Sequence, residues 1–140
     1  MSYELRDHTA DVAVEATGPT LESVFAAAGD GMAAAMCEDV PEASGDRFDF
    51  EVRAESREAL LFDYLDELIY ERDVRTVLPV DNEVAAREAD GDGGEWVAEG
   101  SARGVPLAEI SAREIKAVTY SEMVLEERDE GWRAYVVLDV

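Results

Sequence analysis

The sequence reads HTADV at residues 8–12 and VVLDV at residues 136–140. Each segment is typical of a β-strand that carries one aspartate, Asp11 or Asp139, among apolar neighbours. A half-buried carboxylate costs several kcal/mol unless a cation or strong hydrogen-bond donors compensate it. If the two terminal strands lie together, Asp11 and Asp139 form a pocket of oxygen ligands. The alternative is that Asp11 caps a turn and that Asp139 lies in a frayed terminus.

Two amphipathic helices are predicted between these strands. The first begins after Thr20, a suitable N-cap, and ends near Cys37, because its apolar residues recur at steps of three and four. The second begins after Ser56, and its apolar face continues to Ile69. Both helices are expected to pack one apolar face against strands.

The other apolar patterns alternate at period two and predict strands. These strands cover residues 4–17 with an interruption near 7–10, and residues 48–54, 75–80, 83–88, 95–102, 123–128 and 132–138. Residues 108–120 fit either a short helix or an irregular approach to a strand. We therefore expect an α+β fold, a two-layer sandwich with two long helices on one face of a mainly antiparallel sheet. The length of the chain favours a single domain, residues 1–140.

The charge of the chain restricts its partners. Twelve basic and 34 acidic residues give a net charge of −22. Such a surface repels phosphates and anionic membranes, so we expect contact with RNA only indirectly, through a partner. Lys116 is the only lysine, and an acidic, lysine-poor composition indicates a halophilic, archaeal origin. An acidic protein of a mesophile is the alternative interpretation.

The cellular compartment follows from what the sequence lacks. No apolar run approaches the ~20 residues of a membrane span, and the first residues do not resemble a signal peptide. A single cysteine excludes an internal disulfide. We expect a cytoplasmic protein without membrane association.

Several segments together carry a resemblance to a known family. They are HTADV at residues 8–12, Thr20-Leu21, Leu60-Leu61 with Leu68-Ile69-Tyr70, KAVTY at residues 116–120, and the ending from Gly131-Trp132 to Asp139-Val140. In this order they resemble the archease family, which assists the RtcB-type tRNA-splicing RNA ligase. The resemblance extends over nearly the whole chain.

The resemblance implies a function and a metal site. Archeases promote guanylylation of the ligase's active-site histidine and allow the ligase to turn over repeatedly in tRNA splicing. The chain would then be a cofactor protein of an enzyme and not an enzyme itself. Matching the family's motifs residue by residue assigns Asp11, Asp139 and the terminal carboxylate of Val140 to a divalent metal, most often assigned as calcium. Carboxylate ligands of this kind select calcium or magnesium over zinc.

Two further residues are candidates for accessory roles. His8 is the only histidine, but positions three apart in a strand lie on opposite faces, so it is not simply a ligand alongside Asp11. Lys116 offers a compact ammonium with an adjustable pKa. For His8 the alternative is a structural hydrogen bond, and for Lys116 it is the retention of one lysine by chance. The chain departs from the family at Ser121 and in residues 108–114, where archeases commonly carry histidines.

Two other functions remain open from the sequence. A metal-dependent phosphohydrolase would use Asp11, Asp139 and His8, although no pairing of a nucleophile with a base is visible. A chaperone-like modulator of a tRNA methyltransferase, proposed for this family, would carry the same sequence signature.

Overall fold

We analysed a computed structural model of the 140-residue chain, which describes residues 2–7, 11–42, 44–89 and 95–140. For residues 2, 4–7 and 11 it describes the backbone alone. The described elements are β1 (Ser2–Asp7), β2 (Asp11–Gly18), α1 (Leu21–Met36), β3 (Asp46–Ala54), α2 (Arg57–Arg75), β4 (Val77–Glu88), β5 (Trp96–Pro106), the single-turn η1 (Leu107–Glu109), β6 (Ala117–Arg128) and β7 (Gly131–Asp139).

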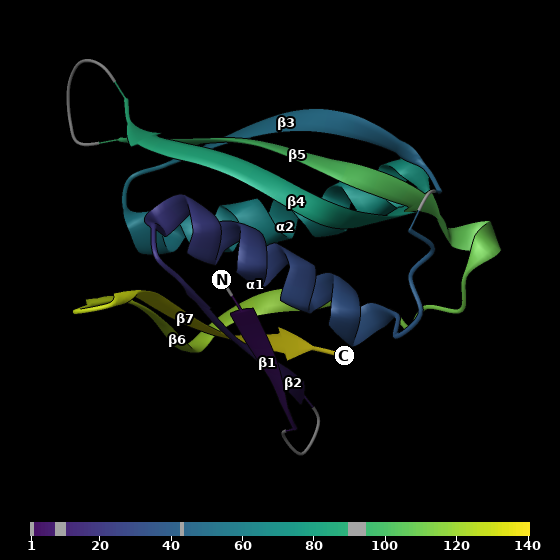
Figure 1. The fold of residues 1–140 in the computed structure, drawn as a ribbon, viewed down its shortest axis with the longest axis horizontal. Coiled ribbons are helices and arrows are strands. Elements are labelled where there is room, and N and C mark those ends of the chain that lie inside the picture. Colours follow the sequence, from purple (N-terminus) through teal and green to yellow (C-terminus); the bar gives the residue numbers. More distant parts are fainter. Residues whose placement is uncertain (1, 8–10, 43, 90–94) are drawn as a thin grey trace.

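The strands form two antiparallel sheets with both helices between them (Figure 1). One sheet has four strands in the order β1-β2-β7-β6, and the other has three in the order β3-β5-β4. The predicted α+β class and the packing of both helices on antiparallel strands are confirmed. The expectation of one sheet in two layers differs from the structure, which has a sheet on each side of the helical layer.

The composition of α1 explains the second sheet. Twelve of its sixteen residues are buried, among them Ala26, Ala27, Gly29 and Gly31 on faces that the apolar stripe does not include. A helix that is apolar all round must be covered all round. Helix α1 accordingly packs against β2 of one sheet and β4 of the other.

Both helices begin at the predicted caps. The Thr20 hydroxyl accepts a hydrogen bond from the Ser23 N–H, and the Ser56 hydroxyl accepts one from the Ala59 N–H. Helix α2 continues to Arg75 and ends at Thr76 in the left-handed conformation, with φ of 53°. The strand predicted from residue 75 therefore begins only at Val77.

A bulge in β4 joins the two helices to the three-stranded sheet. The strands predicted at residues 75–80 and 83–88 are one strand, whose register shifts between Val80 and Glu83. The bulge buries Asn82, whose amide oxygen accepts a hydrogen bond from the Tyr64 hydroxyl at 2.8 Å. Its amide nitrogen donates to Asp30 on α1 at 2.9 Å. Burial raises the pKa of both Tyr64 and Asp30.

The ambiguous stretch at residues 108–120 contains three kinds of structure. The single turn η1 ends at Glu109, residues 111–116 have neither helical nor strand pairing, and β6 begins at Ala117. The register of β6 then shifts between Thr119 and Val124. In this irregular part the Tyr120 ring stacks on Phe62 of α2, with ring centroids 4.1 Å apart.

Among the described residues, no helix is long and apolar enough to cross a membrane.

Candidate metal site at the paired terminal strands

The first and last long strands of the chain lie side by side. Strand β2 pairs with β7 in antiparallel register, and this register places Asp11 directly opposite Asp139. The next pair in this register is Val12 with Leu138, and both side chains are buried in the core. The structure therefore brings together two positions that are 128 residues apart in the sequence.

The opposed backbone positions of Asp11 and Asp139 predict a site that favours a cation. Like charges directly opposite each other in an antiparallel pair are destabilising. A hard divalent cation between the two carboxylates would replace this repulsion by attraction, and carboxylate oxygens are the ligands that such a cation prefers. The donor set of Asp11, Asp139 and the following Val140 thus fits calcium or magnesium, and the metal itself stays a prediction. His8 and the Asp11 side chain lie outside the described part of the chain. In the remainder, no group of three or more His, Cys, Asp or Glu side chains converges on one point.

Lys116 lies beside this site through its backbone. Its N–H donates to the carbonyl oxygen of Asp139 at 2.8 Å, and its side chain is exposed. Strand β6, which follows at once, places Ala117 opposite Asp139 on the side away from Asp11. Residue 139 is therefore held from both neighbouring strands.

Residues 111–116, which we term the connecting segment, hold the Asp139 end of β7 against the helices. The Arg113 N–H donates to the Met36 carbonyl at 2.8 Å, and its Nε donates to the Ala35 carbonyl at 3.0 Å. These bonds satisfy carbonyls of the last turn of α1, which have no partner within the helix. Ile115 is fully buried in the core.

Sequence reasoning missed Arg72, which contacts the same segment. Its side chain is 8% exposed, and its Nη1 donates to the Ile115 carbonyl at 3.1 Å. A signal was present, because residue 72 continues the three- and four-residue steps of Leu65, Leu68 and Ile69. A charged residue on an apolar helix face indicates a buried polar contact.

A groove of about 660 Å³ adjoins the paired strands. It is lined by the last turn of α1, Cys37 to Asp39, residues 111–113 and Val12, the neighbour of Asp11. Glu38 and Asp39 are exposed at this groove, and the Cys37 thiol donates to the Asp39 carbonyl. Two carboxylates against the single guanidinium of Arg113 leave the lining of this groove acidic on balance.

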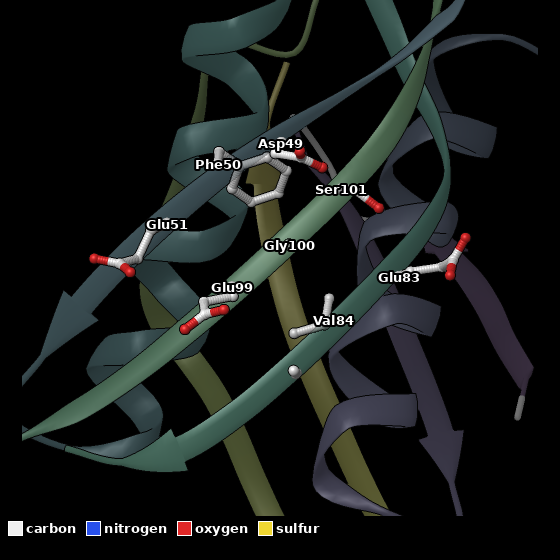
Figure 2. Close-up of a pocket in the computed structure, with 9 residues that line it drawn as sticks. Asp49, Phe50, Glu51, Glu83, Val84, Glu99, Gly100 and Ser101 are labelled. Atoms are coloured by element: carbon white, nitrogen blue, oxygen red, sulfur yellow. The ribbon is translucent and has the colours of Figure 1, made fainter. Parts of the chain in front are cut away.

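A second hollow, of about 650 Å³, lies on the three-stranded sheet. Figure 2 shows the carboxylates of Asp49, Glu51, Glu83 and Glu99 spread around Gly100 and not converging. Three of them form ion pairs with arginines of the same sheet: Glu51 with Arg53, Glu83 with Arg47 and Glu99 with Arg87. This hollow is best described as a hydrated, charge-paired sheet face.

Comparison with known proteins places this architecture in a family. The model of the Archease protein family matches residues 3–140. The chain belongs to the archease family. It is 34% identical to the archease of Archaeoglobus fulgidus over 145 residues, with 100% of both chains covered. It is 30% identical to that of Pyrococcus furiosus, with 99% of this chain and 98% of the relative covered.

Solved structures agree with this assignment. The solution structure of protein 1598 from Methanobacterium thermoautotrophicum superimposes with a TM-score of 0.85 at 31% identity, covering 99% of each chain. The crystal structure of a Thermotoga maritima archease, described as a possible chaperone, superimposes with a TM-score of 0.63. At 20% identity, with 98% of this chain and 96% of that chain covered, the second match supports the fold alone. The resemblance inferred from the sequence segments is confirmed.

Outside the paired strands, two neighbouring glutamates on α2, Glu67 and Glu71, have shifted pKa values. Burial, followed by a hydrogen bond with Glu71, raises the pKa of Glu67 on α2 to about 7. Burial alone would also raise the pKa of Glu71, but the hydrogen bonds from Glu67 and Arg75 lower it overall. The Arg75 Nε donates to Glu71 at 2.6 Å, so the proton resides on Glu67.

We expect Glu67→Gln to stabilise the protein at alkaline pH. Between pH 4.5 and about 7 the unfolded state loses its proton before the folded state does, so the free energy of unfolding of the wild type falls as pH rises. The variant lacks this ionisation. At pH 8 its free energy of unfolding should exceed that of the wild type by ~1 kcal/mol, a value reduced for screening by solvent, and at pH 4 the two should be equal. Urea unfolding of both proteins at several pH values measures this difference. A difference between the two proteins that does not change with pH would contradict the assignment of the proton to Glu67.

Proposed function

We propose that this archease is an accessory protein of an RtcB-type tRNA-splicing RNA ligase, which promotes guanylylation of the ligase and its repeated turnover. Membership of the family supports the class of function. The observation that carries the proposal to particular residues is the register of β2 with β7, which puts Asp11 opposite Asp139. In this proposal the chain acts on an enzyme and performs no covalent step of its own.

The proposed metal ligands are Asp11, Asp139 and Val140. A calcium or magnesium ion bound there would supply positive charge for the oxygens of a nucleoside triphosphate. The chain's own contribution is to hold two carboxylates at the end of a paired strand, where the backbone of residue 139 is fixed on both sides. Val140 packs against the core, which keeps this residue close to the end of β7.

The charge of the chain supports a protein partner over direct contact with RNA. With a net charge of −22, the surface repels the phosphates of tRNA. A ligase that binds RNA and GTP must present basic surface, which complements the acidic groove and the terminal strands. We propose that this end of the molecule docks near the ligase's nucleotide site.

The direct test is covalent attachment of labelled GMP to the ligase of the same organism. Wild-type archease is expected to increase the extent of labelling, and Asp11→Ala and Asp139→Ala are each expected to remove most of that increase. Asp129→Ala is the matched control, because Asp129 lies in the turn between β6 and β7, at the other end of the hairpin from Asp139. It should stimulate like the wild type.

Each other result counts against the proposal. If the wild type does not stimulate labelling, the ligase partnership is wrong, and stable capture of a tRNA methyltransferase would then favour the chaperone-like role. Release of phosphate by the isolated archease, lost in Asp139→Ala, would instead favour a phosphohydrolase. Equal stimulation by all variants would remove the terminal strands from the mechanism.

A further inference from the structure

One peptide group links the buried arginine of α2 to the candidate metal site. The Ile115 carbonyl accepts a hydrogen bond from Arg72 Nη1 at 3.1 Å, and the Lys116 N–H donates to the Asp139 carbonyl at 2.8 Å. These two groups belong to the same peptide unit. Because that unit is planar, the direction of its carbonyl fixes the direction of its N–H.

The connecting segment has few other means of holding this orientation. Residues 111–116 have no helical or strand pairing of their own. Arg113 ties one end of the segment to α1, three residues before Lys116. The pairing of Ala117 with Asp139 fixes the residue that follows this peptide. On the side of the helices, its orientation depends on the Ile115 side chain in the core and on the Arg72 guanidinium.

A contribution to the stability of the fold does not explain why an arginine is buried at position 72. Its side chain is 8% exposed, and its ion-pair partner Asp73 is 63% exposed. A buried charge with one solvated partner gains little from that pairing and loses its own hydration. A long apolar side chain such as methionine would fill the same place among Met36 and Ile115. A buried charge kept under these conditions points to a positional requirement.

We infer that Arg72 is a positioning residue for the metal site: through the 115–116 peptide it adds to the β2 and β6 pairings of residue 139 and helps to hold its backbone in the orientation that presents this aspartate beside Asp11. A hydrogen bond donated to a peptide carbonyl also polarises the N–H of the same unit, so the Arg72 bond strengthens the Lys116 bond. This inference rests on the proposed metal site and deepens it. It gives the lysine of KAVTY a role carried by its backbone.

The experiment combines calcium titration calorimetry with amide hydrogen exchange on Arg72→Met. The expected results are a calcium affinity about tenfold weaker, as is common when a group that orients a metal ligand is removed, and faster exchange of the Lys116 amide. Arg75→Met is the matched control. It removes a neighbouring arginine of α2 whose guanidinium bonds Glu71 and lies over the Phe48 ring.

The control should leave the calcium affinity and the Lys116 exchange unchanged even if it lowers the melting temperature. Arg72→Lys, which keeps a cationic donor without the planar fork, should recover part of the affinity. If the wild type binds calcium and Arg72→Met binds it equally well, the positioning role is wrong. If the wild type binds no divalent cation, the proposed metal site is wrong. If the Lys116 amide exchanges at the same rate in Arg72→Met as in the wild type, the link from Arg72 through the 115–116 peptide is wrong, whatever the result for calcium.

Discussion

Asp139→Asn is expected to weaken calcium binding by roughly 100-fold, the largest functional effect at this site. The affinity of an all-oxygen site depends on the number of charged ligands, and this change removes one of them while keeping the shape of the side chain. The register with Asp11 means that the lost charge lies opposite the remaining one. Calorimetric titration with calcium, at low and at high ionic strength, measures the effect.

The same variant should have the opposite effect on stability when no cation is present. In a chelator, Asp139→Asn removes the repulsion between opposed carboxylates, so its free energy of unfolding should equal or slightly exceed that of the wild type. With calcium, the wild type should gain stability by linkage and the variant should not. Asp129→Asn, the same chemical change in the exposed turn of the β6–β7 hairpin, should leave both measurements unchanged. Equal calcium affinity in Asp139→Asn would exclude this residue as a ligand.

Tyr64→Ala is expected to lower the free energy of unfolding by ~4 kcal/mol, the largest stability effect. Tyr64 is fully buried, and its ring lies 5.8 Å from both Phe25 of α1 and Phe50 of β3. Its removal leaves a cavity in the helical layer and deprives Asn82 of a hydrogen-bond donor in the β4 bulge. Guanidinium unfolding followed by circular dichroism measures the loss.

Two control variants separate packing from hydrogen bonding. Tyr64→Phe keeps the ring and removes only the hydroxyl, so it should cost ~1 kcal/mol. Tyr70→Ala truncates a tyrosine of the same helix that is 57% exposed, and it should change stability by less than ~0.5 kcal/mol. If Tyr64→Phe were as damaging as Tyr64→Ala, the Tyr64–Asn82–Asp30 chain of hydrogen bonds would be the dominant element of this core.

Local structure was predictable wherever neighbours in the sequence determine it. Thr20 and Ser56 were identified as caps because a helix start needs a side-chain acceptor within three residues. The alternation in β3 and the strands at residues 123–128 and 132–138 followed from period-two patterns. The two sheets were not predictable in this way, because alanine and glycine on the outer faces of α1 are compatible with either exposure or burial.

For the candidate site, the sequence by itself determined the chemistry, and the tertiary structure determined the proximity. Aspartates in apolar terminal segments identify oxygen ligands that require compensation. Whether they meet depends on the register of β2 with β7, since a shift of one residue would put Asp11 and Asp139 on opposite faces of the sheet. The partner of Arg72, the 115–116 peptide, was likewise decided by the tertiary structure alone. Their contact joins a helix to an irregular segment 43 positions away, and only the packing of both helices between two sheets brings them together.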